Sequence, residues 1–155
     1  HLAGMVVMVS DKGNGRVRAT DDGRADIQYE FAEADVDRIK QGMVVTAQVL
    51  MAGGAREVFA PVHGVGTHAT PEGLGAALAD RAIRDFTLYA SHPMATCRMG
   101  TDPATSVVDG TGQAHQLPGL HIADASVFPT SLGVNPQLTT LAVSTFIGRQ
   151  VAMER

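Results

Sequence analysis

The sequence predicts an α+β fold, and three observations lead to that class. Apolar side chains occupy alternate positions at Ile27, Tyr29 and Phe31, which is typical of a strand with one buried face. Apolar residues then recur at three- and four-residue spacing from residue 34 to 51, which indicates an amphipathic helix. Finally, a strand, a turn and a buried helix are predicted in one run from residue 120 to about 152. Together these patterns indicate a small antiparallel sheet with packed helices.

Composition narrows the classes of ligand. The chain has 155 residues, 45% of them hydrophobic, which is enough for one buried core. A net charge of -4 without a dense Lys/Arg stretch argues against nucleic acid and against an anionic membrane surface. A single cysteine, Cys97, excludes an internal disulfide framework, and the histidines lack metal-ligand spacing such as HExxH. We therefore expect a small-molecule ligand, no nucleic acid, no transmembrane segment and no metal.

The N-terminal third predicts three strands. The apolar run from Gly4 to Val9 and the segment from Arg16 to Thr20 flank a turn-rich stretch, and a further turn at residues 20–23 precedes the alternating residues 27–31. We expect these three strands to form the antiparallel sheet.

The middle of the chain predicts two helices separated by a short strand. The first helix should run from residue 34 to about 51 and stop at Gly53-Gly54. Residues 57–60 should form an edge strand that ends at Pro61, and residues 63–71 should form a loop. A short helix is predicted at residues 73–80, followed by a strand or extended segment at residues 81–88. Residues 91–119 carry most of the turn signals, and so long an irregular region is usually functional or mispredicted.

The C-terminal run supplies the turn at which we expect chemistry. Residues 120–123 predict a buried strand closed by Asp124. Asn135 is a favoured N-cap and Pro136 suits the first helical position, so a helix should begin there and reach about Ala152. Apolar residues cover most of its circumference, so we expect it to lie inside a protein, with its positive end at the turn.

Four motifs resemble a known family. They are HPMATCRMG at residues 92–100, SVVD at 106–109, ADASVFPTS at 123–131 and NPQLT at 135–139. In this spelling and order they resemble the C-terminal part of a glucose-methanol-choline (GMC) flavoprotein oxidoreductase, of the long-chain alcohol oxidase or cholesterol oxidase-like branch. The match is dense over residues 91–150. Ala95 departs from the family pattern, which usually has Gly there, a change that matters if the backbone needs a positive φ.

The resemblance implies a domain organisation, a cofactor and partners. Residues 1–90 would be part of the substrate-binding (cap) domain, with the antiparallel sheet as its sheet, and residues 91–155 would complete the site for FAD. The family's Rossmann half, with its GxGxxG loop, has no counterpart here, and the first residue is His1 rather than Met. We therefore expect a missing N-terminal FAD-binding segment as a partner, together with an alcohol substrate. No charged leader opens the chain, which favours a cytoplasmic location.

The resemblance also implies site residues. His92 and Asn135 would be catalytic, because oxidation of an alcohol needs an acceptor for the hydroxyl proton and a donor to the developing alkoxide. Asn135, Pro136, Gln137 and Thr139 would present the helix N-terminus to the flavin, and Asp124 and Ala125 would meet its ribityl and pyrophosphate part through backbone N–H groups.

Two other classes of function remain open on the sequence. One is a hydrolase that uses Cys97 or Ser91 with His92, although no GxSxG nucleophile elbow is present. The other is a non-catalytic fragment or subunit that keeps the substrate-domain fold. Cys97 also fits a small buried hydrophobic residue. A flavin spectrum would separate the oxidoreductase from both alternatives.

Overall fold

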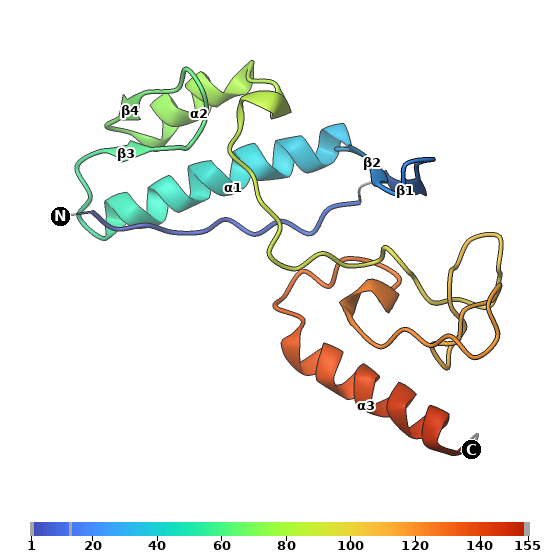
Figure 1. The fold of residues 1–155 in the computed structure, drawn as a ribbon. Coiled ribbons are helices and arrows are strands. Elements are labelled where there is room, and N and C mark those ends of the chain that lie inside the picture. The colour runs from blue at the N-terminus through green and yellow to red at the C-terminus, as the bar shows by residue number, and fades with distance from the viewer. Residues whose placement is uncertain (1, 13, 154–155) are drawn as a thin grey trace. The chain divides into compact units, whose positions relative to one another are not determined.

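The computed structural model describes residues 2–12 and 14–153, which form two units (Figure 1). One unit contains residues 2–12 and 30–89, and the other contains residues 15–29 and 90–153. The helices and strands are β1 (Asn14–Ala19), β2 (Ala25–Glu30), α1 (Glu33–Ala52), β3 (Val58–Phe59), β4 (Thr67–His68), α2 (Pro71–Ala79) and α3 (Gln137–Met153). This mixture of helices and small antiparallel sheets confirms the α+β class.

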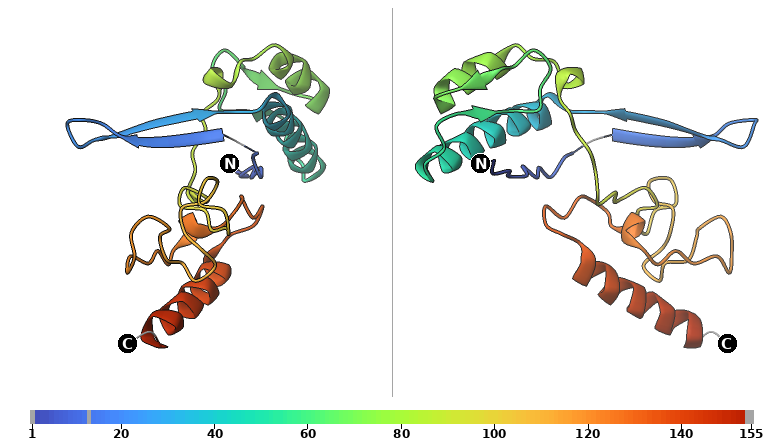
Figure 2. Two further views of the ribbon diagram at one scale, coloured as in Figure 1. Left: turned by 90° about the vertical axis from the view of Figure 1, so that its right-hand side faces the viewer. Right: turned by 60° about the vertical axis from the view of Figure 1, so that its left-hand side comes forward.

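Helices α1 and α2 form the body of the first unit and lie side by side (Figure 2). Both confirm the predicted helices to within two residues. Helix α1 ends at Gly53, and Gly54 follows with φ +97°, a conformation that favours glycine. Helix α2 is capped by Thr70, whose hydroxyl accepts the Gly73 N–H at 3.1 Å. The ammonium of Lys40 donates to the Ala79 carbonyl at 2.7 Å and so ties α1 to the end of α2.

The core of the first unit lies between these helices and β3. Leu78 is fully buried, and Leu74 and Ala47 are each 2% exposed. The buried members of this core are Ile39, Ala47, Val58, Ala60, Val62, Leu74, Leu78 and Phe86.

The predicted strand from Gly4 to Val9 is absent, because residues 2–12 belong to no strand or helix. The segment is extended along α1 instead (Figures 1 and 2). Gly42 makes room for it: a Cβ there would lie 2.5 Å from the Val7 side chain. The Lys12 backbone N–H donates to the buried Asp35 carboxylate at 3.0 Å, and Asp35 also pairs with Arg38. The apolar run therefore packs on a helix, and no described strand pairs with it.

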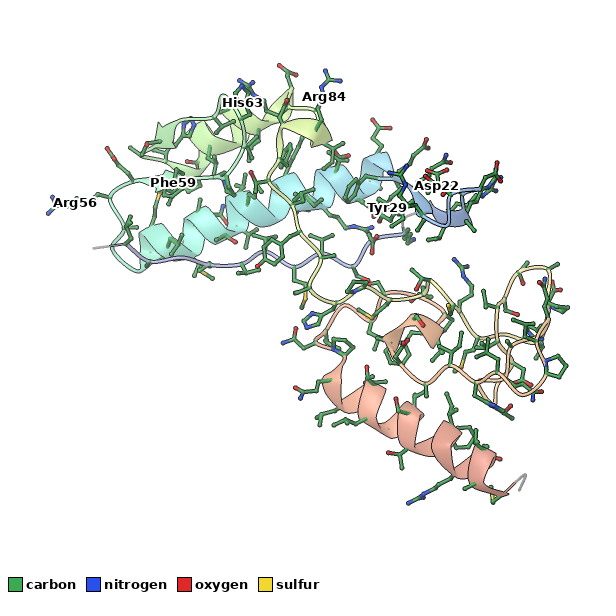
Figure 3. All side chains as sticks on the ribbon, viewed as in Figure 1. Asp22, Tyr29, Arg56, Phe59, His63 and Arg84 are labelled. Atoms are coloured by element: carbon green, nitrogen blue, oxygen red, sulfur yellow. The ribbon has the colours of Figure 1, made fainter. Side chains whose placement is uncertain are left out.

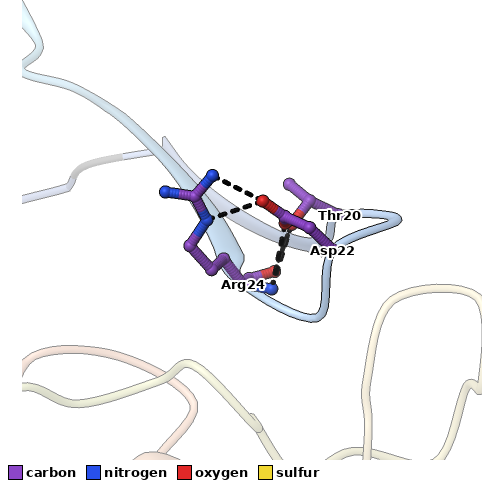
Figure 4. Close-up of polar contacts among 3 residues, drawn as sticks. All are labelled: Thr20, Asp22 and Arg24. Carbon is purple, nitrogen blue, oxygen red and sulfur yellow. Dashed lines mark hydrogen bonds and ion pairs between the residues drawn. The ribbon is translucent and has the colours of Figure 1, made fainter.

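The sheet near the N-terminus is a hairpin of β1 and β2, and has two strands where the sequence predicted three. Its turn is closed by the Thr20 N–H, which donates to the Arg24 carbonyl at 2.9 Å. The Asp22 carboxylate accepts two hydrogen bonds from the Arg24 guanidinium, at 2.7 and 2.5 Å (Figure 4). These bonds, first among the causes, lower the pKa of Asp22 to about 2.

The prediction that one face of β2 packs inward is wrong for the described residues. Ile27 is 70% exposed and Tyr29, labelled on the hairpin in Figure 3, is 44% exposed. A strand buries one face only when a second layer covers it, and the part of the chain that the structure describes supplies no such layer for these side chains.

Two short segments of the first unit differ from their predictions. Strand β3 was predicted, but it pairs antiparallel with β4, which lies in the stretch predicted as loop. Residues 81–88 were predicted to be extended, and they contain a 3-10 turn at Ile83–Asp85 before Phe86 bridges Val62. Strands of two residues are too short to leave a periodic signal in a sequence.

The second unit has an irregular interior, as predicted for residues 91–119. Its core contains the buried residues Val108, Ala114, Val127, Phe128 and Ile147. The strand predicted at Leu120–Ala123 is not formed. The Ala114 N–H donates to the Leu120 carbonyl at 2.8 Å and the Ile122 N–H donates to the Gly112 carbonyl at 2.9 Å, so this segment makes an isolated bridge at His121 and Gln113 in place of a strand.

Helix α3 begins later and is more exposed than predicted. The Thr140 N–H donates to the Pro136 carbonyl at 2.7 Å, so Pro136 occupies the capping position and Asn135 precedes it. Ile147 is buried at 1% exposure, whereas Leu138 is 81% and Leu141 58% exposed. The expectation that α3 lies inside a protein is therefore not met within the described residues. Among the described residues, no helix is long and apolar enough to cross a membrane.

Candidate active site

The first and third motifs are joined by two backbone hydrogen bonds within the second unit. The Cys97 N–H donates to the Ser126 carbonyl at 3.0 Å, and the Met99 N–H donates to the Val127 carbonyl at 2.8 Å. These bonds hold the end of the HPMATCRMG segment against the ADASVFP segment, although the two are more than twenty residues apart in sequence. The loop that carries His92 is thus anchored beside the turn at Asp124.

The ADASVFP segment forms a capped 3-10 turn at Ala125–Val127. One oxygen of the Asp124 carboxylate accepts the Ser126 N–H at 2.8 Å and the Ser126 hydroxyl at 2.5 Å. Val127 and Phe128 are buried and fix the turn in the core, while the hydroxyl of Ser144 on α3 donates to the Ala123 carbonyl. One carboxylate oxygen of Asp124 is thus used inside the turn.

The predicted catalytic side chains are both exposed. His92 lies in the loop before the anchored segment, and Asn135 lies just before α3. Within residues 2–12 and 14–153, no hydrogen bond to either side chain is found. That they share one substrate remains a prediction.

The His92 loop contains a left-handed residue. Ala95 has φ +65° and is the one non-glycine residue with a positive φ among those described. For alanine this conformation costs roughly 1–2 kcal/mol. The sequence-based concern about Ala at this position is therefore justified, since the backbone does take the conformation that glycine favours.

The start of α3 offers unpaired donors. The first N–H groups of any α-helix lack intrahelical partners, and this first turn carries no acidic residue. Gln137 and Thr139 are exposed there. This set of donors suits an anionic or electron-rich group.

A hydrogen-bonded pair lies in the irregular region and was missed by the sequence analysis. The Ser106 hydroxyl and the His115 Nε2 are 2.9 Å apart, and the same nitrogen is 3.1 Å from the Gly100 carbonyl oxygen. Nothing in the sequence signals this pair, because it depends on how an irregular loop folds back on itself.

Asp109, in the SVVD motif, organises the next turn. One of its oxygens accepts the Thr111 hydroxyl at 2.6 Å, the Thr111 N–H at 2.8 Å and the Gln113 N–H at 3.1 Å. These bonds, led by that of the Thr111 hydroxyl, lower the pKa of Asp109. The carboxylate is thus a turn-forming group. In the described residues no cluster of three or more His, Cys, Asp or Glu side chains could hold a metal ion.

Comparison with known proteins decides the family. The family model described as GMC oxidoreductase matches residues 11–144. The chain belongs to the GMC oxidoreductase family. Among its GMC relatives, long-chain-alcohol oxidase FAO4A of Arabidopsis thaliana is 30% identical over 96% of this chain and 21% of its own length. Oxygen-dependent choline dehydrogenase of Pseudomonas putida is 31% identical over 79% of this chain and 21% of its own.

A solved structure agrees with the family match. Pyridoxine 4-oxidase from Mesorbium loti superimposes with a TM-score of 0.62 and 25% identity, over 88% of this chain and 26% of that protein. The chain therefore resembles the C-terminal domain of GMC oxidoreductases in fold as well as in sequence. It spans between a fifth and about a quarter of the length of these relatives.

Proposed function

We propose that this chain is the C-terminal portion of an FAD-dependent oxidoreductase that oxidises an alcohol at a CH–OH group. The observation that carries the proposal is the pair of backbone hydrogen bonds from Cys97 and Met99 to Ser126 and Val127, because they bring two family motifs together. The names of the relatives support the reaction class, since they are a long-chain-alcohol oxidase, a choline dehydrogenase and a pyridoxine oxidase.

The donors of the second unit fit a flavin. GMC family members are generally FAD-dependent, and FAD when bound accepts the hydride of the alcohol carbon. Asn135, Pro136, Gln137 and Thr139 would face its ring through the N-terminus of α3, and the backbone of Asp124 and Ala125 would meet its ribityl and pyrophosphate part. The absence of acidic residues from the first turn of α3 supports this, because a nearby carboxylate would repel the anionic reduced form.

The chain's own residues would handle the proton. His92 accepts the hydroxyl proton of the alcohol on an imidazole nitrogen, as a general base positioned at the reacting group does. Asn135 donates an amide hydrogen bond to the alkoxide oxygen as its charge develops. The Asp124 turn holds the His92 loop in place, since Ser126 and Val127 accept its backbone hydrogen bonds.

The partner that we propose is the remainder of a longer polypeptide carrying an FAD-binding Rossmann fold. Helix α3 leaves an apolar groove open, lined in part by Leu141, Phe146 and Met153, which such a domain would cover. On this proposal residues 1–90 belong to the substrate-binding domain and residues 91–155 complete the FAD site. The isolated chain would then be inactive, because it lacks the main adenosine- and pyrophosphate-binding domain.

The decisive experiment uses the complete flavin-loaded protein. His92→Ala should lower the rate of alcohol-dependent flavin reduction by about 10²- to 10⁴-fold, the usual contribution of a general base, while the flavin absorption spectrum is retained. His63→Ala is the matched control, since His63 is an exposed histidine of the first unit (Figure 3). Unchanged reduction in His92→Ala would remove its role, and a colourless protein would favour the hydrolase or non-catalytic readings.

Asn135 allows a second, independent test. Because Pro136 occupies the capping position, Asn135→Ala should leave the free energy of unfolding nearly unchanged while slowing flavin reduction. Stopped-flow absorbance and urea unfolding measure the two effects separately. Normal reduction in this variant would show that Asn135 makes no contact with the reacting oxygen.

A further inference from the structure

His115 bridges the two segments on either side of residues 101–105. Its Nε2 lies 3.1 Å from the Gly100 carbonyl oxygen and 2.9 Å from the Ser106 hydroxyl oxygen. Both His115 and Ser106 are partly buried. Gly100 permits the close approach, because a Cβ there would lie 3.0 Å from the Ser106 Cβ.

The hydrogen-bond partners determine which ring nitrogen carries a proton. The Ser106 hydroxyl donates its one proton to the Asp102 carbonyl at 2.5 Å, so its oxygen can only accept from the ring. The Gly100 carbonyl can also only accept. Nε2 of His115 must therefore be protonated and shares its hydrogen between the two oxygens. Ser106 is not an activated nucleophile, because that role would require an unprotonated Nε2.

Gly100, which His115 contacts, ends the segment that carries His92, and this end is held by further backbone hydrogen bonds. The Gly100 N–H donates to the Val108 carbonyl at 2.9 Å, and the Val107 N–H donates to the Arg98 carbonyl at 2.9 Å. On its other side the same segment is held by the Met99 N–H bond to Val127. Residues 98–100 are thus fixed between the SVVD segment and the ADASVFP segment.

We propose that His115 is a positioning residue for the His92 loop, and that its protonated Nε2, bonded to Gly100 and Ser106, holds the end of the HPMATCRMG segment in register with the Asp124 turn. The inference rests on the proposed function for the role of His92. The assignment of the proton and the restraint on residues 98–100 do not depend on that function.

The ring proton is tested directly on the 155-residue chain. Nitrogen-15 NMR of the His115 ring should show a pyrrole-type Nε2 at neutral pH, coupled to a slowly exchanging proton. His115→Phe should then accelerate hydrogen exchange at the Met99 and Gly100 amides, while His63→Phe, the same change in the first unit, should leave them unchanged. A pyridine-type Nε2, or unaltered exchange in His115→Phe, would overturn the proposal.

Turnover is tested in the complete flavin-loaded protein. His115→Phe should lower kcat by about tenfold or more with a smaller change in KM, because a small displacement of a catalytic group slows the reaction more than it weakens binding. His115→Gln, whose amide nitrogen can take the place of Nε2, should restore most of the rate, whereas His115→Asn, which reaches only as far as Nδ1, should not. A purely structural role would lower stability in these variants without this pattern.

The outcomes separate this proposal from the proposed function. If the wild-type complete protein shows no alcohol-dependent flavin reduction, the proposed function fails, and NMR of the chain still decides whether His115 fixes residues 98–100. If flavin is reduced normally in His115→Phe while His92→Ala is inactive, the function stands and the positioning role is wrong. Equal rates in His115→Gln and His115→Phe would contradict the assigned role of Nε2.

Discussion

The two units of this chain bury their apolar surface in different ways. In the first unit, helices α1 and α2 pack on each other, and Leu78 between them is fully buried. In the second unit the core is built mainly by loop residues such as Val108 and Val127, and α3 buries Ile147 while Leu138 remains 81% exposed. The first unit therefore buries apolar residues between two helices, whereas in the second unit α3 packs on loop residues and leaves Leu138, Leu141 and Phe146 exposed.

This difference in packing places the ordered loops in the second unit. The irregular segments of the second unit are held by backbone hydrogen bonds between motifs, such as that from Met99 to Val127, rather than by regular strands. Loops positioned in this way commonly carry binding and catalytic residues. Under the proposed function, the open apolar side of α3 is the surface that the FAD-binding domain would cover.

The largest expected effect contrasts a leucine from each unit. Leu78→Ala should lower the free energy of unfolding by about 2–5 kcal/mol, because it removes a fully buried side chain. Leu138→Ala should change it by less than about 0.5 kcal/mol, because that side chain is 81% exposed. Urea unfolding of both variants measures the contrast, and equal losses would show that α3 is covered in solution.

Two glycines of the second unit test how tightly its loops pack. Gly112 (φ +82°) and Gly119 (φ +84°) have the same backbone conformation, but a Cβ at Gly112 would lie 2.7 Å from Ile147 Cδ1, whereas one at Gly119 meets nothing within 4 Å. Gly119→Ala should therefore lower the free energy of unfolding only by the cost of the left-handed conformation for alanine, about 1–2 kcal/mol. Gly112→Ala should cost about 1–3 kcal/mol more because of overpacking. Similar melting temperatures for both variants would contradict a close-packed loop core.

Ala95→Gly should stabilise the second unit, by about 1 kcal/mol. The substitution removes the strain of φ +65°, and this gain exceeds the entropy that glycine adds to the unfolded chain. Ala104→Gly is the control, because Ala104 lies in the same irregular region without a positive φ and should lose stability. Calorimetric melting temperatures that fall for both variants would show that Ala95 is not strained.

The smallest effect is a pH dependence shared by both units. The pKa of Asp35 lies below its ordinary 3.8, first because the Lys12 N–H binds its carboxylate, and the pKa of Asp109 is lowered mainly by the Thr111 hydroxyl. A carboxyl group whose pKa is lowered in the folded state stabilises the protein above pH 3.8. This stabilisation is lost as the pH falls below 3.8 toward the pKa of the folded state. Asp35→Asn should destabilise the chain at pH 7 but much less at pH 3, as measured by urea midpoints. A pH-independent difference would show that the charge of Asp35 is unimportant.

Much of the helical structure could be predicted from residue spacing. Helix α1 depends on contacts that repeat every three or four residues, and its end depends on Gly53-Gly54, so a local pattern was sufficient. The family motifs were equally local, because each is a short run of letters, and the family match confirms them. The roles of His92 and Asn135 stay predictions, since they depend on a substrate and a flavin.

The strands were predicted less well, for a physical reason. Gly4 to Val9 has the composition of a strand, but a strand exists only when another strand accepts its hydrogen bonds, and this segment packs along α1 instead. Ile27 alternates as an inward-facing residue would, yet it is 70% exposed because its burial depends on a second layer. The composition of a segment shows which side chains could be buried, whereas the tertiary structure determines whether another part of the protein covers them.

The amino-acid sequence by itself determined the α+β class, the extent of the helices and the GMC motifs, because all of these are encoded by residues close together along the chain. Only the tertiary structure decided that Met99 pairs with Val127, that His115 binds Gly100 and Ser106, and that one side of α3 stays open. These features join segments that are distant in sequence or depend on a covering surface, and no local pattern of residues specifies either.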